Sequence, residues 1–266
     1  MKKTLIALAV AASAVVSGSA LAATTWNPGD FNGSFEMGGQ LTPPTQTGNP
    51  WSVAVGDNVT NLDATLDAGQ KEVAINVANP VAVLGIRPTE NKMFTGQAGI
   101  TPQISYGDAV DLNSFVGGMG TLTLPVKSGE QAIGSLTTKI YTGGVQVWAE
   151  DYNGMIDGAA RSAHASAAGK AFYGGVGKTM EAIDQDSGSV ISKASAFFSD
   201  ITDTYQDPTD YPGIAGEVDF ANARFQYSGL YASGIPAGET VRITLKSALS
   251  DATSWTASLP VTVSYQ

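Results

Sequence analysis

The chain has 266 residues, a formal net charge of −10 and no cysteine. An acidic surface repels phosphate backbones and argues against nucleic acid as a partner, and a single histidine without cysteine argues against a zinc site. The length allows a large core without disulfides, in one domain with an insertion or in two domains.

The N-terminus has the pattern of a secretory signal peptide. Lys2 and Lys3 precede an apolar run over residues 5–16, and small residues follow up to Ala22. The run is too short to span a bilayer as a helix. We expect residues 1–22 to be removed during export to the periplasm, which leaves 12 basic residues against 24 acidic ones.

A strictly alternating segment follows the expected cleavage site. One face of residues 30–41 carries four large apolar side chains and two glycines, and the other face carries polar residues or glycine. The residues of the apolar face are Phe31, Gly33, Phe35, Met37, Gly39 and Leu41. The segment is predicted to be either the first strand of the chain's own sheet or a strand built to fill a groove elsewhere.

The rest of the chain has the composition of an all-β protein. Short alternating runs rich in Val, Thr, Ile and Ser predict strands, and glycine-containing turns separate them, Gly143-Gly144 among them. The expected strands are residues 51–55, 72–77, 81–86, 121–126, 133–141, 145–148, 218–227, 240–245 and 258–265.

The pattern changes between about residues 151 and 216. Two alanine-rich segments, 159–171 and 190–203, are predicted to be short helices. In the second segment, five residues fall on one apolar helical face, namely Val190, Ala194, Phe197, Phe198 and Ile201. We interpret this region as a partly helical insertion on a β-sandwich.

The C-terminus alternates as strictly as the N-terminal segment. The apolar positions Leu259, Val261, Val263 and Tyr265 continue to the last residue but one, so the chain is expected to stop inside a strand. Pro260 lies on the opposite face, where a missing N–H is tolerated only at a sheet edge or a bulge.

Residues that suggest other chemistry are weak candidates. His164 is expected on the surface of a small-residue helix, and Asp184 and Asp186 are expected in a helix-capping turn instead of a calcium loop. No catalytic residue, metal site or cofactor is predicted. Aromatic residues among Asp and Asn side chains are candidates for glycan binding, with Trp148, Tyr173 and Tyr211 selected, although such aromatics also fix an insertion to its sandwich.

The sequence resembles subunits assembled by the chaperone–usher pathway, and among them the kappa-class enteric fimbrial subunits typified by the K-88 fimbria. The matching stretches follow one another in order along most of the chain: residues 1–9, 29–34, Leu84-Gly85, Phe172-Tyr173-Gly174-Gly175, and Trp255-Thr256-Ala257 with the ending at Tyr265. The family's tryptophan-flanked motif is reduced here to Pro50-Trp51-Ser52, and Gln266 replaces the expected final aromatic residue or serine. These departures leave open whether the chain is a major or a minor subunit.

The resemblance implies an immunoglobulin-like sandwich that lacks its final strand. It implies residues 23–42 as a donor-strand extension and 43–266 as a pilin domain with an inserted, receptor-binding region at about 148–216. Donor plugs would be Phe31, Phe35, Met37 and Leu41, with Gly33 and Gly39 at shallow positions of the groove.

The implied partners are further subunits, a periplasmic chaperone, an outer-membrane usher and a host glycan. The chaperone would bind the edge formed by Leu259, Val261, Val263 and Tyr265. The expected location is a surface fimbria, without enzymatic activity. Two alternatives are an outer-membrane β-barrel and a periplasmic glycan-active enzyme.

Overall fold

The computed structural model describes residues 48–152, 155–209 and 211–266, all within the compact unit Thr45–Gln266. These residues form mostly β-structure with one α-helix, α1 (Ser187–Phe197), and one 3₁₀ turn, η1 (Met180–Ala182). The strands are β1 (Trp51–Val55), β2 (Glu72–Asn76), β3 (Val81–Pro88), β4 (Phe94–Thr95), β5 (Pro102–Ser105), β6 (Val110–Val116), β7 (Met119–Ser128), β8 (Gln131–Tyr152), β9 (Met155–His164), β10 (Gly216–Glu217), β11 (Gln226–Ile235), β12 (Thr240–Leu245) and β13 (Thr262–Tyr265).

The long strand β8 organises the main sheet. Its 22 residues pair with β12 and β7 at one end and with β11 and β9 at the other. The order through the sheet is β1-β3-β11-β8-β12-β2, with β1 and β2 at the two ends of this path. The sheet is open, and β10 adds a short parallel pairing to β9.

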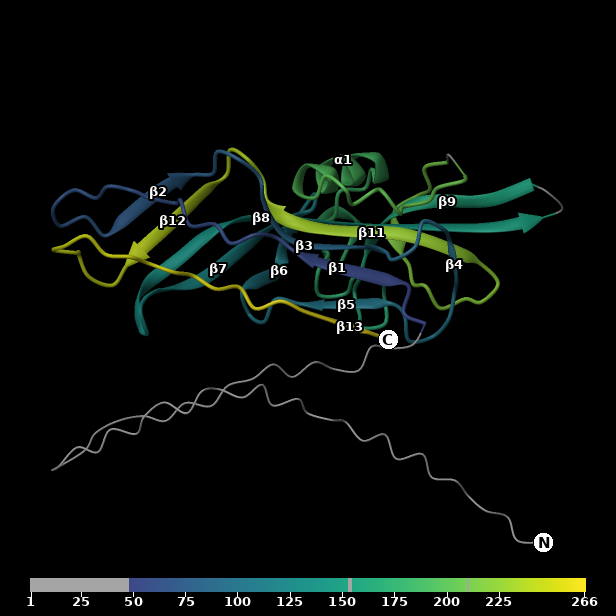
Figure 1. Cartoon of the computed structure of the whole chain (residues 1–266), viewed down its shortest axis with the longest axis horizontal. Helices are drawn as coiled ribbons and strands as arrows, with labels where there is room; N and C mark the ends of the chain where they lie inside the picture. Colours follow the sequence, from purple (N-terminus) through teal and green to yellow (C-terminus); the bar gives the residue numbers. More distant parts are fainter. Residues whose placement is uncertain (1–47, 153–154, 210) are drawn as a thin grey trace, which may run out of the picture. The chain divides into compact units, whose positions relative to one another are not determined.

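Two layers cover the main sheet. Figure 1 shows α1 on one face and the two-stranded β13–β5 sheet on the other. Side chains from β5 and the residue after it, such as Ile104 and Tyr106, join those of the main sheet in the principal core. Ring contacts extend through this core, with Trp51 4.8 Å from Phe220 and Phe172 5.4 Å from Tyr231 between ring centroids.

The sequence-based strands agree with the structure at several points. The expected strands 51–55 and 240–245 are confirmed to the residue as β1 and β12, and 121–126 lies within β7. The Gly143-Gly144 turn is wrong, because both glycines lie inside β8. A Cβ on Gly143 would lie 2.8 Å from Val190 Cγ1, and one on Gly144 would lie 2.4 Å from the Phe172 ring. Glycine is needed here for close packing on both faces of the sheet.

The predicted helix at 159–171 is also wrong. Residues up to His164 belong to β9, which pairs antiparallel with β8. Ala159, Ala160 and Ala163 are small because neighbouring layers cover the strand and leave them fully buried. Tertiary packing therefore overrides the intrinsic helix propensity of alanine.

The second predicted helix is confirmed with different bounds. It begins three residues earlier than expected, where the Asp186 carboxylate accepts hydrogen bonds from the N–H groups of Gly188 and Ser189 at 2.9 and 3.3 Å. This confirms Asp186 in a helix-capping turn. The helix ends at Phe197, and Ile201 is buried in the turn that follows.

The expected strand 218–227 is wrong over most of its length. Only Gly216–Glu217 and the residues from Gln226 onward are strands. Val218 and Phe220 lie in a loop, and each is buried by a different contact. The Val218 carbonyl accepts a hydrogen bond from Ala171 N–H, and the Phe220 ring packs on Trp51.

No helix in the described ranges is long and apolar enough to cross a membrane.

Candidate functional site

An open edge of the main sheet lies along β1. Gly56 N–H donates to the Val83 carbonyl at 3.2 Å, and Thr89 N–H donates to the Pro50 carbonyl at 2.7 Å. Because hydrogen-bonded pairs alternate in an antiparallel ladder, the backbone groups of Val53 and Val55 point away from β3. No described strand pairs with that side of β1. The side chains of Val53 and Val55 are 44% and 66% exposed, which is unusual for valine in a sheet.

A second open edge lies along the C-terminal segment. Gln266 and Thr101 exchange two backbone hydrogen bonds, of 3.0 and 2.9 Å, so the alternation directs the backbone of Val263 and Tyr265 away from β5. Upstream, Thr256 exchanges two bonds of 2.9 Å with Lys127. Among the described strands, β13 pairs only with β5. The expected strand 258–265 is thus confirmed only at Thr262–Tyr265.

A cavity of about 810 Å³ separates these two edges. One wall is the chain from Val55 to Asp63, and the other is the segment from Ala252 to Val261. The floor consists of apolar side chains from five strands of the main sheet, namely Val81, Val83, Leu122, Leu124, Leu136, Ile235 and Val241. The site is therefore an apolar groove between two backbone edges that lack strand partners among the described residues.

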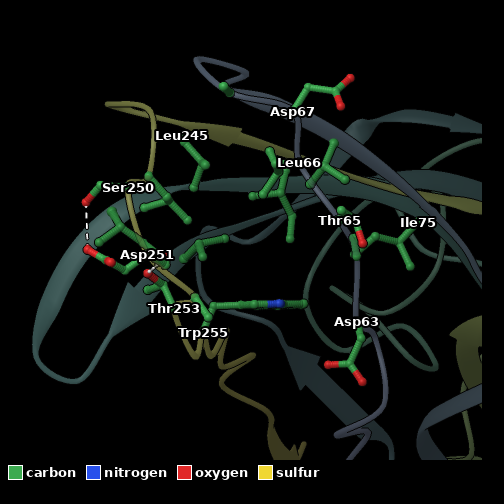
Figure 2. Close-up of a pocket in the computed structure, with 18 of the residues that line it drawn as sticks. Asp63, Thr65, Leu66, Asp67, Ile75, Leu245, Ser250, Asp251, Thr253 and Trp255 are labelled. Carbon is green, nitrogen blue, oxygen red and sulfur yellow. Dashed lines mark hydrogen bonds between the residues drawn. The ribbon is translucent and has the colours of Figure 1, made fainter.

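The groove continues into an end chamber of about 730 Å³, whose walls include Asp63, Thr253 and Trp255 of the first cavity. Figure 2 shows Leu66, Leu245 and Trp255 around this chamber and the Ser250–Asp251 hydrogen bond at its rim. Its lining includes Asp63, Asp67 and Asp251, and no lysine or arginine among the described residues. The end chamber therefore combines an apolar interior with an acidic rim.

The four C-terminal residues selected from the sequence lie on one face of the C-terminal segment. Leu259, Val261, Val263 and Tyr265 are half-buried, whereas the residues between them are exposed. Leu259 and Val261 line the cavity directly. Burial raises the pKa of the Tyr265 phenol, and a hydrogen bond with Asn49 opposes that shift. The six donor-strand residues, Phe31, Gly33, Phe35, Met37, Gly39 and Leu41, lie outside the described residues.

The sequence analysis missed part of the groove. Val53, Val55 and Trp255 line or border it, but alternation predicts a strand without indicating which edge is left unpaired. The exposed valines of β1 carry no signal in the sequence that separates them from ordinary strand residues.

Trp148 and Tyr211, two of the selected aromatic residues, lie on either side of β9, and Tyr173 lies elsewhere. Trp148 pairs with Ala159 of β9, and the Tyr211 carbonyl accepts the N–H of Ala160 on the same strand. Tyr173 instead accepts the Ile104 N–H beside β5. Trp148 is half-buried and Tyr211 is 63% exposed.

Four large apolar side chains are exposed in the β9 region. They are Met155, Ile156, Tyr211 and Ile214, with exposed fractions of 72, 49, 63 and 83%. Figure 1 shows that the β8–β9 hairpin projects past the rest of the sheet. This apolar surface is separate from the groove, whose exposed valines lie on and just after β1.

The polar residues considered for catalysis or metal binding do not assemble into a centre. His164 lies at the end of β9, not on the predicted helix, and is the parallel neighbour of Glu217 on β10. No group of three or more metal-ligating side chains occurs in the described part of the chain.

Comparisons with known proteins agree with this picture of an assembling subunit. The family model described as "Fimbrial, major and minor subunit" of the K88 type matches residues 1–266. K88 fimbrial protein AB of Escherichia coli is 31% identical over the full length of both chains, and K88 fimbrial protein AC of the same organism is 32% identical over the full length of both. The K88 minor fimbrial subunit FaeI of Escherichia coli is 27% identical over 91% of this chain and 92% of its own.

The match over the whole length shows the role of the chain as a non-enzymatic structural subunit, located on fimbriae at the cell surface and assembled with other subunits. The chain therefore belongs to the K88-type family of major and minor fimbrial subunits.

Proposed function

We propose that this subunit polymerises by donor-strand exchange, in which residues 31–41 of one copy fill the groove of the next. The observation that carries the proposal is the pair of open edges, β1 and the C-terminal segment, on either side of an apolar cavity. A strand placed between them completes both ladders and covers the half-buried side chains. The incomplete immunoglobulin-like sandwich becomes a complete one.

The dimensions of the two segments support the pairing. One side of the C-terminal segment carries six half-buried residues, at every second position from Trp255 to Tyr265. The apolar face of the donor also has six positions, from Phe31 to Leu41. Both spans cover ten residue steps, or about 33 Å at about 3.3 Å per residue. The end chamber beyond Trp255 provides further apolar surface where the donor ends.

An open groove needs protection before assembly. Unpaired strand edges and exposed apolar surface promote aggregation. We therefore propose that a periplasmic chaperone supplies a strand at the edge formed by Leu259, Val261, Val263 and Tyr265, and that an outer-membrane usher exchanges it for the donor of the next subunit.

A matched pair of donor variants tests the exchange. Phe35→Asp places a charge on the face that enters the groove, whereas Ser34→Asp places the same charge on the opposite face. We expect Phe35→Asp to reduce fibre length and number at least tenfold by electron microscopy while the subunit still accumulates with its chaperone, and Ser34→Asp to form normal fibres. Normal fibres from Phe35→Asp would refute the donor assignment.

We also propose that the inserted region at about 148–216 contributes to adhesion to host glycans. Exposed apolar side chains favour this function, because sugar faces pack on exposed aromatic and apolar side chains. Met155 and Ile156 lie on the projecting hairpin, and Tyr211 and Ile214 lie on the segment that runs beside β9. The double variant Met155→Ser/Tyr211→Ala is expected to lower binding of fibres to a glycan array at least tenfold. Val116→Ser, which changes an apolar residue that is 74% exposed outside this region, is the control. Equal binding by both variants would contradict the adhesive role.

A further inference from the structure

Two arginines and two aromatic rings form a row near the base of the β8–β9 hairpin. The Arg161 guanidinium lies 5.6 Å from the Trp148 ring centroid, and Trp148 lies 5.0 Å from Phe225 in an edge-to-face contact. At the far end of the row, Arg224 lies 5.7 Å from the Phe225 ring. These four residues come from β8, β9 and the loop before β11.

Arg161 differs from the other three arginines of the chain. Arg87 pairs with Asp200, Arg224 pairs with Glu150, and Arg242 is exposed on β12. Arg161 is half-buried, and within the described ranges it has no ion pair and no hydrogen-bond acceptor. A charged group that is partly removed from water without an acid partner costs free energy, and the contact with the Trp148 ring offsets this cost only in part.

Two side-chain N–H groups of this row lack a hydrogen-bond partner among the described residues. Trp148 Nε1 and Arg161 Nε are both buried without a hydrogen-bond partner in the described part of the chain. The segment that contains Gly213 packs closely on Arg161, because a Cβ on Gly213 would lie 2.8 Å from Arg161 Cγ. Trp148 and Arg161 therefore each carry an N–H donor without a partner among the described residues, and the backbone of the exposed Tyr211 pairs with β9, the strand of Arg161.

The acidic side chains nearby do not neutralise Arg161. The Glu150 carboxylate accepts a hydrogen bond from Arg224 Nε at 2.7 Å, and this bond is the main cause of the raised pKa of Arg224. The charge of Asp157 adds a smaller effect on the same arginine. Both acids act on Arg224 at the other end of the row, and neither forms an ion pair with Arg161 among the described residues.

We propose that Arg161 and Trp148 form a subsite for the acidic group of a glycan, either the carboxylate of a sialic or uronic acid or a sulfate ester. This inference rests on the proposed adhesive function and names its ligand class. A planar guanidinium matches the geometry of a carboxylate or sulfate with two parallel hydrogen bonds. The Tyr211 and Trp148 rings provide the adjoining apolar surface for the sugar.

The test compares acidic and neutral forms of one glycan on assembled fibres. The probes are lactose, 3′-sialyllactose and 6-sulfated lactose, with affinities measured by surface plasmon resonance at low and high salt. We expect at least one acidic probe to bind at least tenfold more tightly than lactose, with a preference that falls as salt rises. The two acidic probes distinguish a carboxylate from a sulfate as the preferred group.

Three variants assign the preference to Arg161. Arg161→Gln is expected to lower binding of the acidic probe to the lactose level, and Arg161→Lys to restore it only in part because lysine lacks the planar fork. Arg242→Gln removes an exposed arginine of β12 and is expected to change nothing. Electron microscopy and thermal melting of each variant report assembly and folding independently.

Two outcomes overturn the inference. Equal affinity for lactose and both acidic probes would remove the acidic subsite while leaving adhesion in place. Absence of binding to all three probes and to a wider glycan array, by fibres that assemble normally, would overturn both the subsite and the adhesive function.

Discussion

The hydroxyl groups of Tyr106, Tyr231 and Ser233 form a hydrogen-bond network inside the core. Tyr106 Oη lies 2.8 Å from Tyr231 Oη and 2.6 Å from Ser233 Oγ, and Tyr231 donates to the Gly175 carbonyl at 2.9 Å. Burial raises the pKa of Tyr106 to about 12, although the hydrogen bonds with Ser233 and Tyr231 oppose the shift. Tyr106 directly follows β5, so the network holds the end of β5, the strand that pairs with β13, against β11.

The network predicts a loss of stability at alkaline pH. At pH 9 and below, Tyr106 is almost entirely neutral in both the folded and the unfolded state. As pH rises from 10 toward 12 the unfolded state loses its proton first, which lowers the free energy of unfolding by about 2 kcal/mol at pH 11.5. Urea unfolding of a monomer with residues 30–41 fused behind Gln266 measures this loss between pH 9 and pH 11.5. Tyr106→Phe is expected to show a loss about 2 kcal/mol smaller, and the exposed Tyr211→Phe a loss equal to that of the parent. Equal losses in all three proteins would contradict the assignment.

At the scale of elements, the C-terminal segment is only partly a strand. It is hydrogen-bonded at Thr256 and again from Thr262 to Gln266, while the groove-lining Leu259 lies between these two points. Its alternation of half-buried and exposed side chains continues through the unpaired part. The segment is therefore preformed for a strand that pairs on its open side.

This alternation predicts different effects for residues on the two faces of the segment. Leu259→Asp introduces a charge into the groove, whereas Ser264→Asp introduces it at an exposed position of the same segment that does not line the cavity. We expect Leu259→Asp to be degraded in the periplasm and to yield at least tenfold fewer fibres, and Ser264→Asp to accumulate normally. Immunoblots of periplasmic fractions measure accumulation. Similar amounts of both variants would show that the face of the segment does not matter.

The elements that alternation identifies are those with one covered face. β7 and β12 were predictable for this reason, since one side of each strand is more exposed than the other. β11 and the part of β9 from Ala159 onward are largely buried on both faces, so their small residues lack a period-two pattern, and this part of β9 was predicted as a helix. Gly143 and Gly144 were assigned to a turn because close packing on two faces has no local signature.

The candidate site was predictable only in part. The apolar alternation of Leu259 to Tyr265 indicated one wall of the groove. The other wall depends on β1 lying at the end of the sheet path, which is a property of the strand order and not of any segment. Arg161 was not predicted, because its lack of an acid partner appears only when β8 and β9 are paired.

At the scale of the whole molecule, the two surfaces proposed to be functional lie at different points along β8. The groove is formed by β1, the C-terminal segment and the strands beneath them, and the glycan surface is formed by the β8–β9 hairpin and the segment from Tyr211 to Ile214. Strand β8 contributes Leu136 to the groove floor and Trp148 to the hairpin. A subunit with this arrangement assembles through one surface and leaves the other exposed for binding.

Thermal unfolding of residues 48–266, with and without residues 30–41 fused behind Gln266 through a short flexible linker, tests the central claim most directly. We predict that the fused segment raises the free energy of unfolding, and each net gain of about 3 kcal/mol raises Tm by about 6–12 °C in a domain of this size. The unfused domain is expected to aggregate or to unfold at a lower temperature. A fused Phe35→Asp segment should give no gain. An unfused domain that is monomeric, fully folded and heat-resistant, with no further rise in Tm on fusion, would contradict the account.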